Sequence, residues 1–472
     1  MEPRDVPADP ALPGLATALD ETAMRAILSE AIQAGGGAPL ERCTITWIKY
    51  KPGRSCTVAW RLLLGDGAAS TEQRAYGRMF PPGASLERFV RTSTARRVPT
   101  AAGPAVLHLS GHDMVVWLFP NDRKLHGLEA LTDPAMLRDV LLPEVLVGRW
   151  GSGWRPMEVA SRIVHCVPEH TCTIRLELTA RHAESGVRSA TLYGKTYYND
   201  EGRAAAEVMQ RLWDRRHADP DMPALAEPWG WQPAHRILWQ EEVAGEPLSD
   251  DRDRVASDGA RLEQVATAIA AVHRVPPGAG KAMQLREVAR RLQDAERLVR
   301  GGRPDAGDAC QALVERLLAR PPRLSGPLVT MHGDLHLENF LVDGRSLALI
   351  DLDTVRPGLP WCDLGSLAAA MIADGLARGR QGAAIQRSVE VLCDAYRSRV
   401  AWTIDDESLA WFIDAALVYE RAVRCITRLK PGAWALLDAI LAWVGAGETR
   451  VRSDDARMQA VAAPLREGAA AP

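Results

Sequence analysis

The chain has 472 residues. A single hydrophobic core usually organises a shorter chain, so we expect two or three domains. Its 57 Lys and Arg residues nearly balance 60 Asp and Glu residues, which argues against a basic surface for nucleic acid or anionic membranes. No apolar run approaches the roughly 20 residues of a membrane helix, and the N-terminal stretch lacks an apolar signal-peptide core. We therefore expect a cytoplasmic globular protein.

The eight cysteines are scattered along the chain and form no CxxC pair. In a chain of this size that pattern is typical of free thiols in a reducing compartment, and not of a disulfide framework. We therefore expect no disulfide.

Two segments of the N-terminal half, residues 48–64 and 164–180, alternate apolar with other residues as half-buried strands do. They carry the same residues in step: Pro52 with Pro168, Cys56 with Cys172, and Thr57 with Thr173. Two further stretches match in the same order: 75–80 "AYGRMF" with 192–197 "LYGKTY", and 114–128 with 236–250. These matches indicate an internal duplication. The alternative is two unrelated antiparallel hairpins that look alike because strands draw on few residue types.

Beyond about residue 250 the pattern becomes helical. "DACQALVERLLA" places Leu313, Val314, Leu317 and Leu318 on one face. We expect further helices in "DLGSLAAAMIADGLA" and "LAWFIDAALVYERAVRCITRL". The segment "GRWGSGWRP" at 148–156 is a plausible linker between the repeats, and the last 17 residues are expected to form a frayed tail.

The stretch "LVTMHGDLHLENFLVDGRSLALIDLDTV" sets many polar groups between apolar strands. The Asp-Gly pair in "VDGRS" predicts a tight hairpin, whose return strand "LALI" ends at Asp351. Asp334 and Asn339 have the spacing D-x-x-x-x-N, and we expect their loop to meet Asp351 at one end of a small sheet. A carboxylate to orient a hydroxyl, an amide oxygen and a second carboxylate for magnesium are the groups that phosphoryl transfer needs.

"HGDLHLENFLV", followed by "LIDLD" and "WCDLGSL", resembles the aminoglycoside phosphotransferase and choline kinase family of protein-kinase-like folds. The resemblance covers roughly residues 160–430. It implies that Asp334 is the catalytic base and that Asn339 and Asp351 are magnesium ligands. It also implies that Asp363 is a structural acid that braces the loop.

The second repeat would supply the nucleotide-binding half of such a site. The resemblance implies that Lys195 contacts the α and β phosphates of ATP and is held by Glu207 of the following helix. The segment Glu241 to Val243 resembles the hinge beside which adenine stacks. The turn "VPEHTCT" departs from the family pattern because it has no glycine to cover the phosphates closely, so His170 or Thr171 is a candidate to contribute there.

The first repeat looks degenerate. Arg78 stands where the second repeat has Lys195, and Glu87 follows, but no catalytic loop follows this copy. We interpret it as a structural or substrate-facing extra sheet without its own ATP. Gly53 in this first repeat is nevertheless compatible with a contact to a phosphate group.

Two other interpretations remain open. His332, Asp334 and His336 are metal-ligand types, so "HGDLH" is also compatible with a metallohydrolase cluster, although no further histidines stand at ligand spacing. Four aromatic residues are compatible either with a cage for a cationic substrate or with a helical core: Trp402, Trp411, Phe412 and Tyr419.

Together these features predict an α+β, bilobal protein-kinase-like fold with a duplicated, degenerate small-lobe-like domain at the N-terminus. The expected parts are the degenerate repeat (residues 1–158), the nucleotide-binding lobe (159–245), the helical catalytic lobe (246–455) and the tail (456–472). We expect an ATP- and Mg²⁺-dependent phosphotransferase that moves the γ-phosphate to a hydroxyl of a small molecule, without nucleic-acid or membrane partners. The alternatives are a protein or peptide kinase and a catalytically inactive kinase-like binding module.

Overall fold

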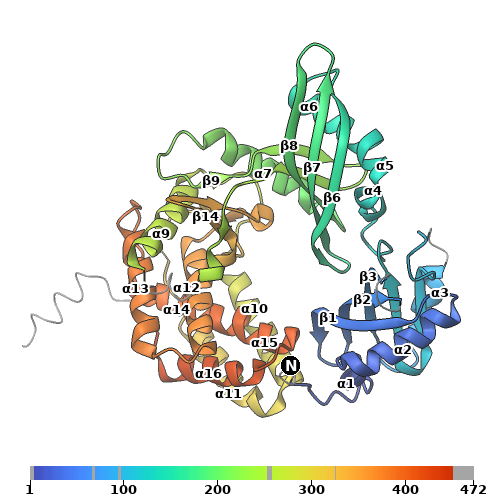
Figure 1. Ribbon diagram of the computed structural model, residues 1–472. Helices are drawn as coiled ribbons and strands as arrows, with labels where there is room; N and C mark the ends of the chain where they lie inside the picture. The colour runs from blue at the N-terminus through green and yellow to red at the C-terminus, as the bar shows by residue number, and fades with distance from the viewer. Residues whose placement is uncertain (1–4, 66–69, 94–96, 252–257, 325, 450–472) are drawn as a thin grey trace, which may run out of the picture. The chain divides into compact units, whose positions relative to one another are not determined.

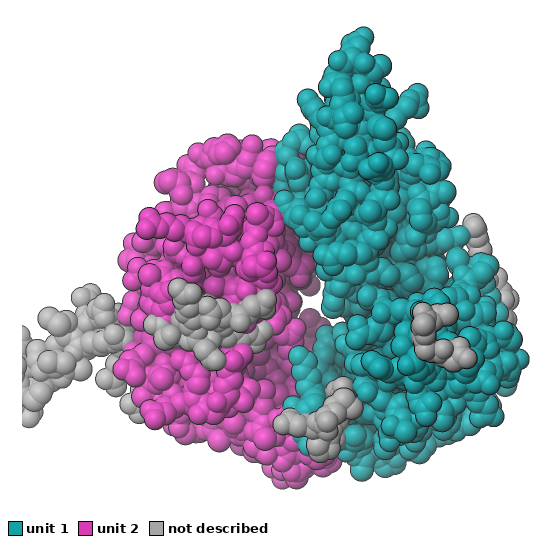
Figure 2. Space-filling view, viewed as in Figure 1, with its two compact units in different colours: residues 1–207, 227–242, 426–431 teal, residues 208–226, 243–425, 432–472 magenta. Residues whose placement is uncertain are grey.

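The computed structural model describes residues 5–65, 70–93, 97–251, 258–324 and 326–449. They fall into two compact units, coloured separately in Figure 2. Unit 1 comprises residues 1–207, 227–242 and 426–431, and unit 2 comprises 208–226, 243–425 and 432–472. The predicted tail at 456–472 lies outside the described residues.

Unit 1 begins with two helices, α1 (Leu15–Ala18) and α2 (Glu21–Ala34). Asp20 caps α2 by accepting hydrogen bonds from the N–H groups of Thr22 and Ala23. The helix buries Met24, Leu28 and Ile32, which recur every four residues and so form one apolar face. α2 packs along the first strand of a five-stranded sheet (Figure 1).

This first sheet is antiparallel throughout, with strand order β1-β2-β3-β5-β4. Its strands are β1 (Leu40–Lys51), β2 (Ser55–Leu64), β3 (Thr71–Met79), β4 (Val106–Leu109) and β5 (Met114–Leu118). The helix α3 (Ser85–Ser93) follows the third strand.

The second sheet of unit 1 is also antiparallel, with strand order β6-β7-β8-β11-β10. Its strands are β6 (Arg155–Val167), β7 (Thr171–His182), β8 (Gly186–Tyr197), β10 (Pro228–Gln232) and β11 (Ile237–Glu241). Here too a helix, α7 (Glu201–Arg215), follows the third strand.

One face of the second sheet is covered by helices that precede it in the chain (Figure 1). They are α4 (Leu128–Thr132), α5 (Pro134–Met136), a π-helical segment (Leu137–Leu141) and α6 (Leu142–Trp150). Leu137, Leu141 and Leu146 of this layer pack with Ile174 and Leu176 of β7 in one buried cluster. The other face of the sheet is left to polar side chains, which are described below.

The two sheets share strand order and register, so equivalent positions can be read from the pairing. Thr57 of β2 lies opposite Arg78 of β3, and Thr173 of β7 lies opposite Lys195 of β8. The sequence matches Thr57 with Thr173 and Arg78 with Lys195, and the register agrees with both matches. The match of 114–128 with 236–250 is displaced by one residue, because Gly77 pairs with Val116 whereas Gly194 pairs with Trp239.

Unit 2 contains two small sheets and most of the helices, which confirms the helical pattern predicted beyond residue 250. The sheet orders are β12-β14-β15-β9 and β13-β16. The strands are β9 (Ala224–Leu225), β12 (Glu246–Pro247), β13 (Val329–Met331), β14 (Phe340–Asp343), β15 (Ser346–Leu349) and β16 (Arg356–Gly358).

Most helices of this second half have more than ten residues, and α12 is almost wholly buried. They are α9 (Gly259–Arg274), α10 (Leu285–Gly302), α11 (Pro304–Ala319), α12 (Pro360–Ala377), α13 (Gly382–Arg397), α14 (Asp406–Ala416), a π-helical segment η6 (Leu417–Ala422), α15 (Val423–Arg428) and α16 (Ala433–Ala446). Trp411 and Phe412 lie in this core, in edge contact with each other, which favours the core interpretation for these two residues. No helix in the described ranges is long and apolar enough to cross a membrane. The mixture of helices and antiparallel sheets confirms the α+β prediction.

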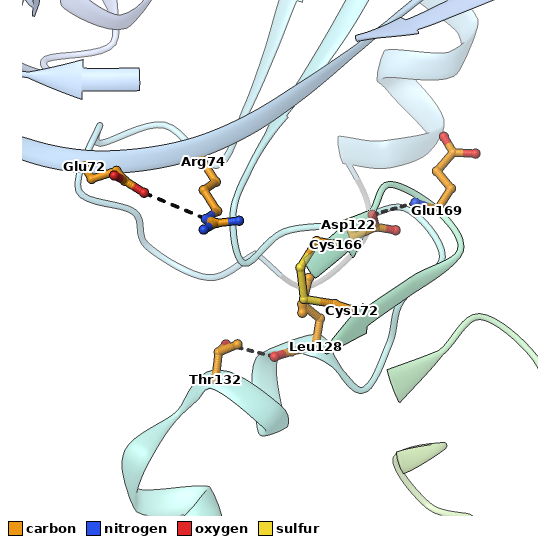
Figure 3. The surroundings of a disulfide bond; sticks show 8 residues. All are labelled: Glu72, Arg74, Asp122, Leu128, Thr132, Cys166, Glu169 and Cys172. Carbon is orange, nitrogen blue, oxygen red and sulfur yellow. Dashed lines mark hydrogen bonds and ion pairs between the residues drawn. A yellow bond between two sulfur atoms is a disulfide. The ribbon is translucent and has the colours of Figure 1, made fainter. Parts of the chain in front are cut away.

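The structure differs from expectation in its cysteines and in the segment between the two sheets. Cys166 and Cys172, directly opposite each other in β6 and β7, form a disulfide (Figure 3), whereas the sequence predicts none. The other six cysteines are free and buried. Residues 148–150, expected in a linker, belong to α6, and a boundary after residue 158 falls inside β6. The break between elements is the short loop at 151–154.

Gly194 tests how closely the second sheet is packed. A Cβ at this position would lie 2.6 Å from the ring of buried Trp239, so Gly194→Ala should lower the free energy of unfolding by about 1–3 kcal/mol through overpacking. Gly148→Ala is the matched control, because its Cβ would meet nothing within 4 Å and α6 gains a better helix former. Thermal unfolding should show a lower Tm for Gly194→Ala alone; a wild-type Tm would contradict the packing described.

Candidate active site

The polar loop between β13 and β14 has the predicted architecture. β13 leads into His332, and the loop closes with a single 3-10 turn (Leu337–Asn339) before β14. The Asp343–Gly344 turn joins β14 to β15, with Gly344 at φ 57°, as the tight-hairpin prediction requires. The N–H of Ile350 donates to the carbonyl oxygen of Asn339 at 2.9 Å. Asn339 and Asp351 therefore lie at the same end of the small sheet, as predicted.

Gly333 is required by the loop backbone. Its φ is +88°, a conformation that favours glycine, and an added Cβ would lie 2.6 Å from the carbonyl oxygen of Thr354. The hydroxyl of Thr354 in turn donates to the carbonyl oxygen of His332 at 2.8 Å. The close approach of these two chain segments explains the glycine of the "HGD" motif.

Asp363, at the start of α12, braces the loop as the sequence predicts. Its carboxylate accepts the backbone N–H of His332 at 2.5 Å and that of Gly333 at 2.8 Å. It also contacts Nε2 of His273 at 3.0 Å, and Nδ1 of His273 lies 2.7 Å from the hydroxyl of Tyr396. Burial alone would raise the pKa of Asp363, but the hydrogen bond from His273, nearby positive charge and the Gly333 N–H outweigh it, so the pKa lies below its usual value.

Asn339 and Asp351, the predicted metal ligands, offer an amide oxygen and a carboxylate, which suit a hard cation such as Mg²⁺. Asn339 is buried, and its Oδ1 accepts the N–H of His336 at 2.9 Å, which fixes its orientation. Asp351 is exposed and adopts a left-handed backbone conformation (φ 60°, ψ 53°). Such a conformation is uncommon for a non-glycine residue and is found preferentially at functional sites.

The metallohydrolase interpretation receives no support. In the described part of the chain, no group of three or more His, Cys, Asp or Glu side chains could hold a metal ion. Nε2 of His332 instead lies 3.0 Å from the carbonyl oxygen of Ile350, as expected of a structural histidine. Asp334 is half-buried. Burial lowers the pKa of His336, and the negative charge of Asp334 partly offsets this lowering.

Sequence reasoning missed two charged residues near Asp334, the half-buried Glu420 and the buried Arg421. Both belong to the π-helical segment η6, a type of irregularity that is frequent at functional sites. Burial, and to a smaller extent the charge of Asp334, raises the pKa of Glu420, which accepts a hydrogen bond from Ser366 at 2.7 Å. Burial likewise lowers the pKa of Arg421, and its Nε has no hydrogen-bond partner within the described residues. The apolar periodicity of this segment gave no sign of the π-helical segment.

The predicted nucleotide-binding residues belong to the second sheet and its flanks. Lys195 points from β8 with its Nζ 5.6 Å from the centroid of the Tyr197 ring, and Glu207 is exposed on α7. The N–H of Glu241 donates to the carbonyl oxygen of Glu227. A ligand would therefore have to contact other groups of Glu241. Val243 is half-buried directly after β11.

The open face of this sheet is polar. Arg175 makes two hydrogen bonds to Glu242, of 2.6 and 3.0 Å, and the hydroxyl of Tyr193 donates to the same carboxylate at 3.2 Å. A hollow of about 660 Å³ adjoins this cluster, lined in part by Thr191, Glu241 and Glu242. The predicted hinge residue Glu241 therefore borders a hollow with strong hydrogen-bonding groups.

The model of the phosphotransferase enzyme family matches residues 185–402. The match confirms the resemblance carried by the "HGDLH" stretch, which lies within the matched segment. No curated protein shows significant similarity to the chain.

Several solved structures are similar to the chain at low identity. A choline/ethanolamine kinase family protein from Mesorhizobium loti has 15% identity and a TM-score of 0.40, with 64% of this chain and 92% of that chain covered. A spectinomycin phosphotransferase, solved with ADP and spectinomycin, has 12% identity and a TM-score of 0.42, with 65% and 98% covered. An ethanolamine kinase from Plasmodium vivax has 12% identity and a TM-score of 0.39, with 71% and 88% covered.

The brace at Asp363 predicts a pH dependence of stability. Because the folded-state pKa is depressed, the ionised carboxylate stabilises the fold above its unfolded pKa of about 3.9, and this stabilisation is lost as the pH falls through the folded pKa. Asp363→Asn should therefore cost about 3 kcal/mol at pH 7, and less as the pH falls below about 4. Denaturant unfolding of both proteins across this range measures the difference. The control is Asp343→Asn in the exposed hairpin turn; a pH-independent loss in Asp363→Asn would contradict the assignment.

Proposed function

We propose that the protein is an ATP- and Mg²⁺-dependent phosphotransferase that moves the γ-phosphate to a hydroxyl group of a small molecule. The observation that carries this proposal is the loop from His332 to Asn339, whose backbone is fixed by two hydrogen bonds to buried Asp363. Phosphoryl transfer depends on positioning and electrostatics more than on covalent chemistry, so a rigid loop that presents a carboxylate is the central requirement.

In this proposal Asp334 receives the acceptor. Its carboxylate accepts the hydrogen bond of the acceptor hydroxyl and takes the proton as the oxygen bonds to the γ-phosphorus and the bond to ADP breaks. Asn339 and Asp351 would hold Mg²⁺, which supplies charge neutralisation on the phosphate oxygens. The hydrogen bond from the His336 N–H keeps the Asn339 amide oxygen oriented.

We further propose that the second sheet contributes the nucleotide contacts. Lys195, held on β8 opposite Thr173, would contact the α and β phosphates, and Glu207 would steady its ammonium group. Backbone groups from Glu241 to Val243 would contact adenine. The polar cluster of Arg175, Tyr193 and Glu242 makes hydrogen bonding more prominent on this face than apolar stacking.

We infer that the first sheet is a duplicate of the second that does not carry out phosphoryl transfer. The shared strand order, the helix after each third strand and the equivalent pairs Thr57–Arg78 and Thr173–Lys195 support the duplication. Only the second copy is followed in the sequence by the loop that carries Asp334.

The role of Asp334 is tested by Asp334→Asn. The amide keeps the shape but cannot take the proton, so turnover should fall by about 10² to 10⁴ while nucleotide affinity hardly changes. Glu338→Gln, an exposed carboxylate of the same loop, is the control. Coupled ADP release with an acceptor found in a panel of hydroxyl compounds measures turnover; near wild-type turnover in Asp334→Asn would remove the assignment.

The metal site is tested by Asp351→Ala. Loss of an anionic oxygen ligand should abolish the Mg²⁺-dependent part of the Tm increase caused by ATP, and Asn339→Ala should reduce that part less because a neutral ligand is lost. Asp343→Ala, on the same hairpin, should behave as wild type. Full Mg²⁺-dependent protection of Asp351→Ala would place the metal elsewhere.

A further inference from the structure

The first sheet carries a row of cationic side chains on one face. Lys49 of β1 pairs with Thr57 of β2, which pairs in turn with Arg78 of β3, so the three residues lie in a line across neighbouring strands. Lys51 lies two residues beyond Lys49 and therefore on the same face. Adjacent strands are about 4.8 Å apart, so the backbones of Lys49 and Arg78 are separated by about 10 Å, a span that their long side chains can close.

These cations are close enough to perturb one another. Burial is the main cause that lowers the pKa of Lys49, and the charges of Lys51, Arg428, Lys124 and Arg78 lower it further. The pKa of Lys51 is lowered in the same way, by burial first and then by neighbouring cations that include Arg78. A bound anion would relieve this repulsion.

A carboxylate from the second sheet already contacts the edge of this cationic cluster. Glu169, in the turn between β6 and β7, contacts Nη1 of Arg78 at 2.8 Å, Nη2 of Arg123 at 2.6 Å and Nζ of Lys124 at 3.8 Å. Its side chain is only 9% exposed. Burial alone would raise the pKa of Glu169, but the hydrogen bond from Arg123 and the surrounding cations outweigh it, so the pKa lies below its usual value and the carboxylate stays ionised.

The turn is also fixed through its backbone. The N–H of Glu169 donates to Oδ2 of Asp122 at 2.9 Å, a contact drawn in Figure 3. Glu169 has a φ of 60°, in the left-handed region that favours glycine. This one carboxylate does not satisfy every donor of the cluster, because Nε of Arg78 is buried and has no hydrogen-bond partner among the residues that the structure describes.

We propose that this face of the first sheet, with Lys49, Lys51, Arg78 and Lys124 as its cations, binds a diphosphate or longer phosphate group in place of the Glu169 carboxylate. A diphosphate fits better than a single carboxylate, because it spreads several charged oxygens over a cluster that extends across three strands. The group can come from an inorganic polyphosphate or from the polyphosphate tail of a nucleotide. None of these four residues is among those proposed above to take part in phosphoryl transfer.

The exchange has a structural consequence for the second sheet. Glu169 directly precedes His170 and Thr171, the residues that stand in the glycine-free turn of the second copy. An anion that replaces Glu169 releases the side-chain contacts of this turn to Arg78 and Arg123. Occupancy of the first sheet thus sets how firmly the turn of the second sheet is held.

Titration calorimetry of the full chain with inorganic pyrophosphate, in buffer with EDTA and no metal, tests the site. Lys49→Gln/Lys51→Gln should weaken binding about tenfold or more, since charge-assisted contacts are lost. Glu169→Gln should tighten it by about three- to tenfold, because a competing intramolecular anion is removed. If Glu169 made only a structural contact, Glu169→Gln would not raise the affinity for pyrophosphate. Arg78→Gln should also weaken binding, and the Lys49→Gln/Lys51→Gln variant remains the test should Arg78→Gln fold poorly.

Arg181→Gln and Glu184→Gln, exposed near the far turn of the second sheet, are the matched charge controls and should bind as wild type. ATP without metal is the second arm: equal or tighter binding than pyrophosphate, with the same variant pattern, supports polyphosphate recognition. Binding of ATP without any binding of pyrophosphate would overturn it. Unchanged affinity in Glu169→Gln, or loss in Lys195→Met but not in Lys49→Gln/Lys51→Gln, would also overturn the inference. None of these results decides whether the protein transfers a phosphoryl group, which the Asp334 variant tests separately.

Discussion

The buried carboxylate of Asp363 is the interaction on which the candidate active site depends. It holds two successive backbone N–H groups, of His332 and Gly333, at the point where the loop turns through a left-handed glycine. A buried carboxylate is costly unless it is fully hydrogen-bonded, and the contact with His273 completes its shell. The residue that follows, Asp334, is therefore attached to a backbone that hydrogen bonds hold in place. Rigid positioning of this kind is what a phosphotransferase needs.

The two sheets of unit 1 share one strand order but carry side chains of different chemistry. The register places Ala59 of the first sheet at the position of Arg175 in the second, and Arg78 at the position of Lys195. The first sheet packs Ala59 in an apolar cluster beside a cationic row, whereas Arg175 makes a hydrogen-bonded cluster with Glu242. Glu169 joins the two sheets through Arg78. Arg78, which stands at the position of Lys195, thus contacts the turn between β6 and β7 of the second sheet.

Local patterns predicted the strands, the Asp-Gly hairpin, the helices of the second half and the delivery of Asp351 to the loop, because turn chemistry and apolar periodicity act over a few residues. Interactions between distant segments could not be predicted in this way. His273 lies 90 residues before Asp363, and Arg78 lies 91 residues before Glu169. The Cys166–Cys172 disulfide was missed because cysteine spacing alone does not reveal a cross-strand pair. The π-helical segment that carries Glu420 and Arg421 was not predicted, because the sequence pattern indicated only a helix there.

The central claim is that the braced loop and Asp351 hold a divalent cation together with a nucleotide, and it can be tested before any acceptor is known. Mn²⁺ accepts the same carboxylate and carbonyl ligands as Mg²⁺, and electron paramagnetic resonance distinguishes its free from its bound form. Titration of Mn²⁺ into the full chain should show bound metal only when ADP is present. The Asn339→Ala/Asp351→Ala double variant should leave Mn²⁺ as free as it is in a solution of ADP alone. Equal ADP-dependent binding of Mn²⁺ by the wild type and the double variant would contradict the account.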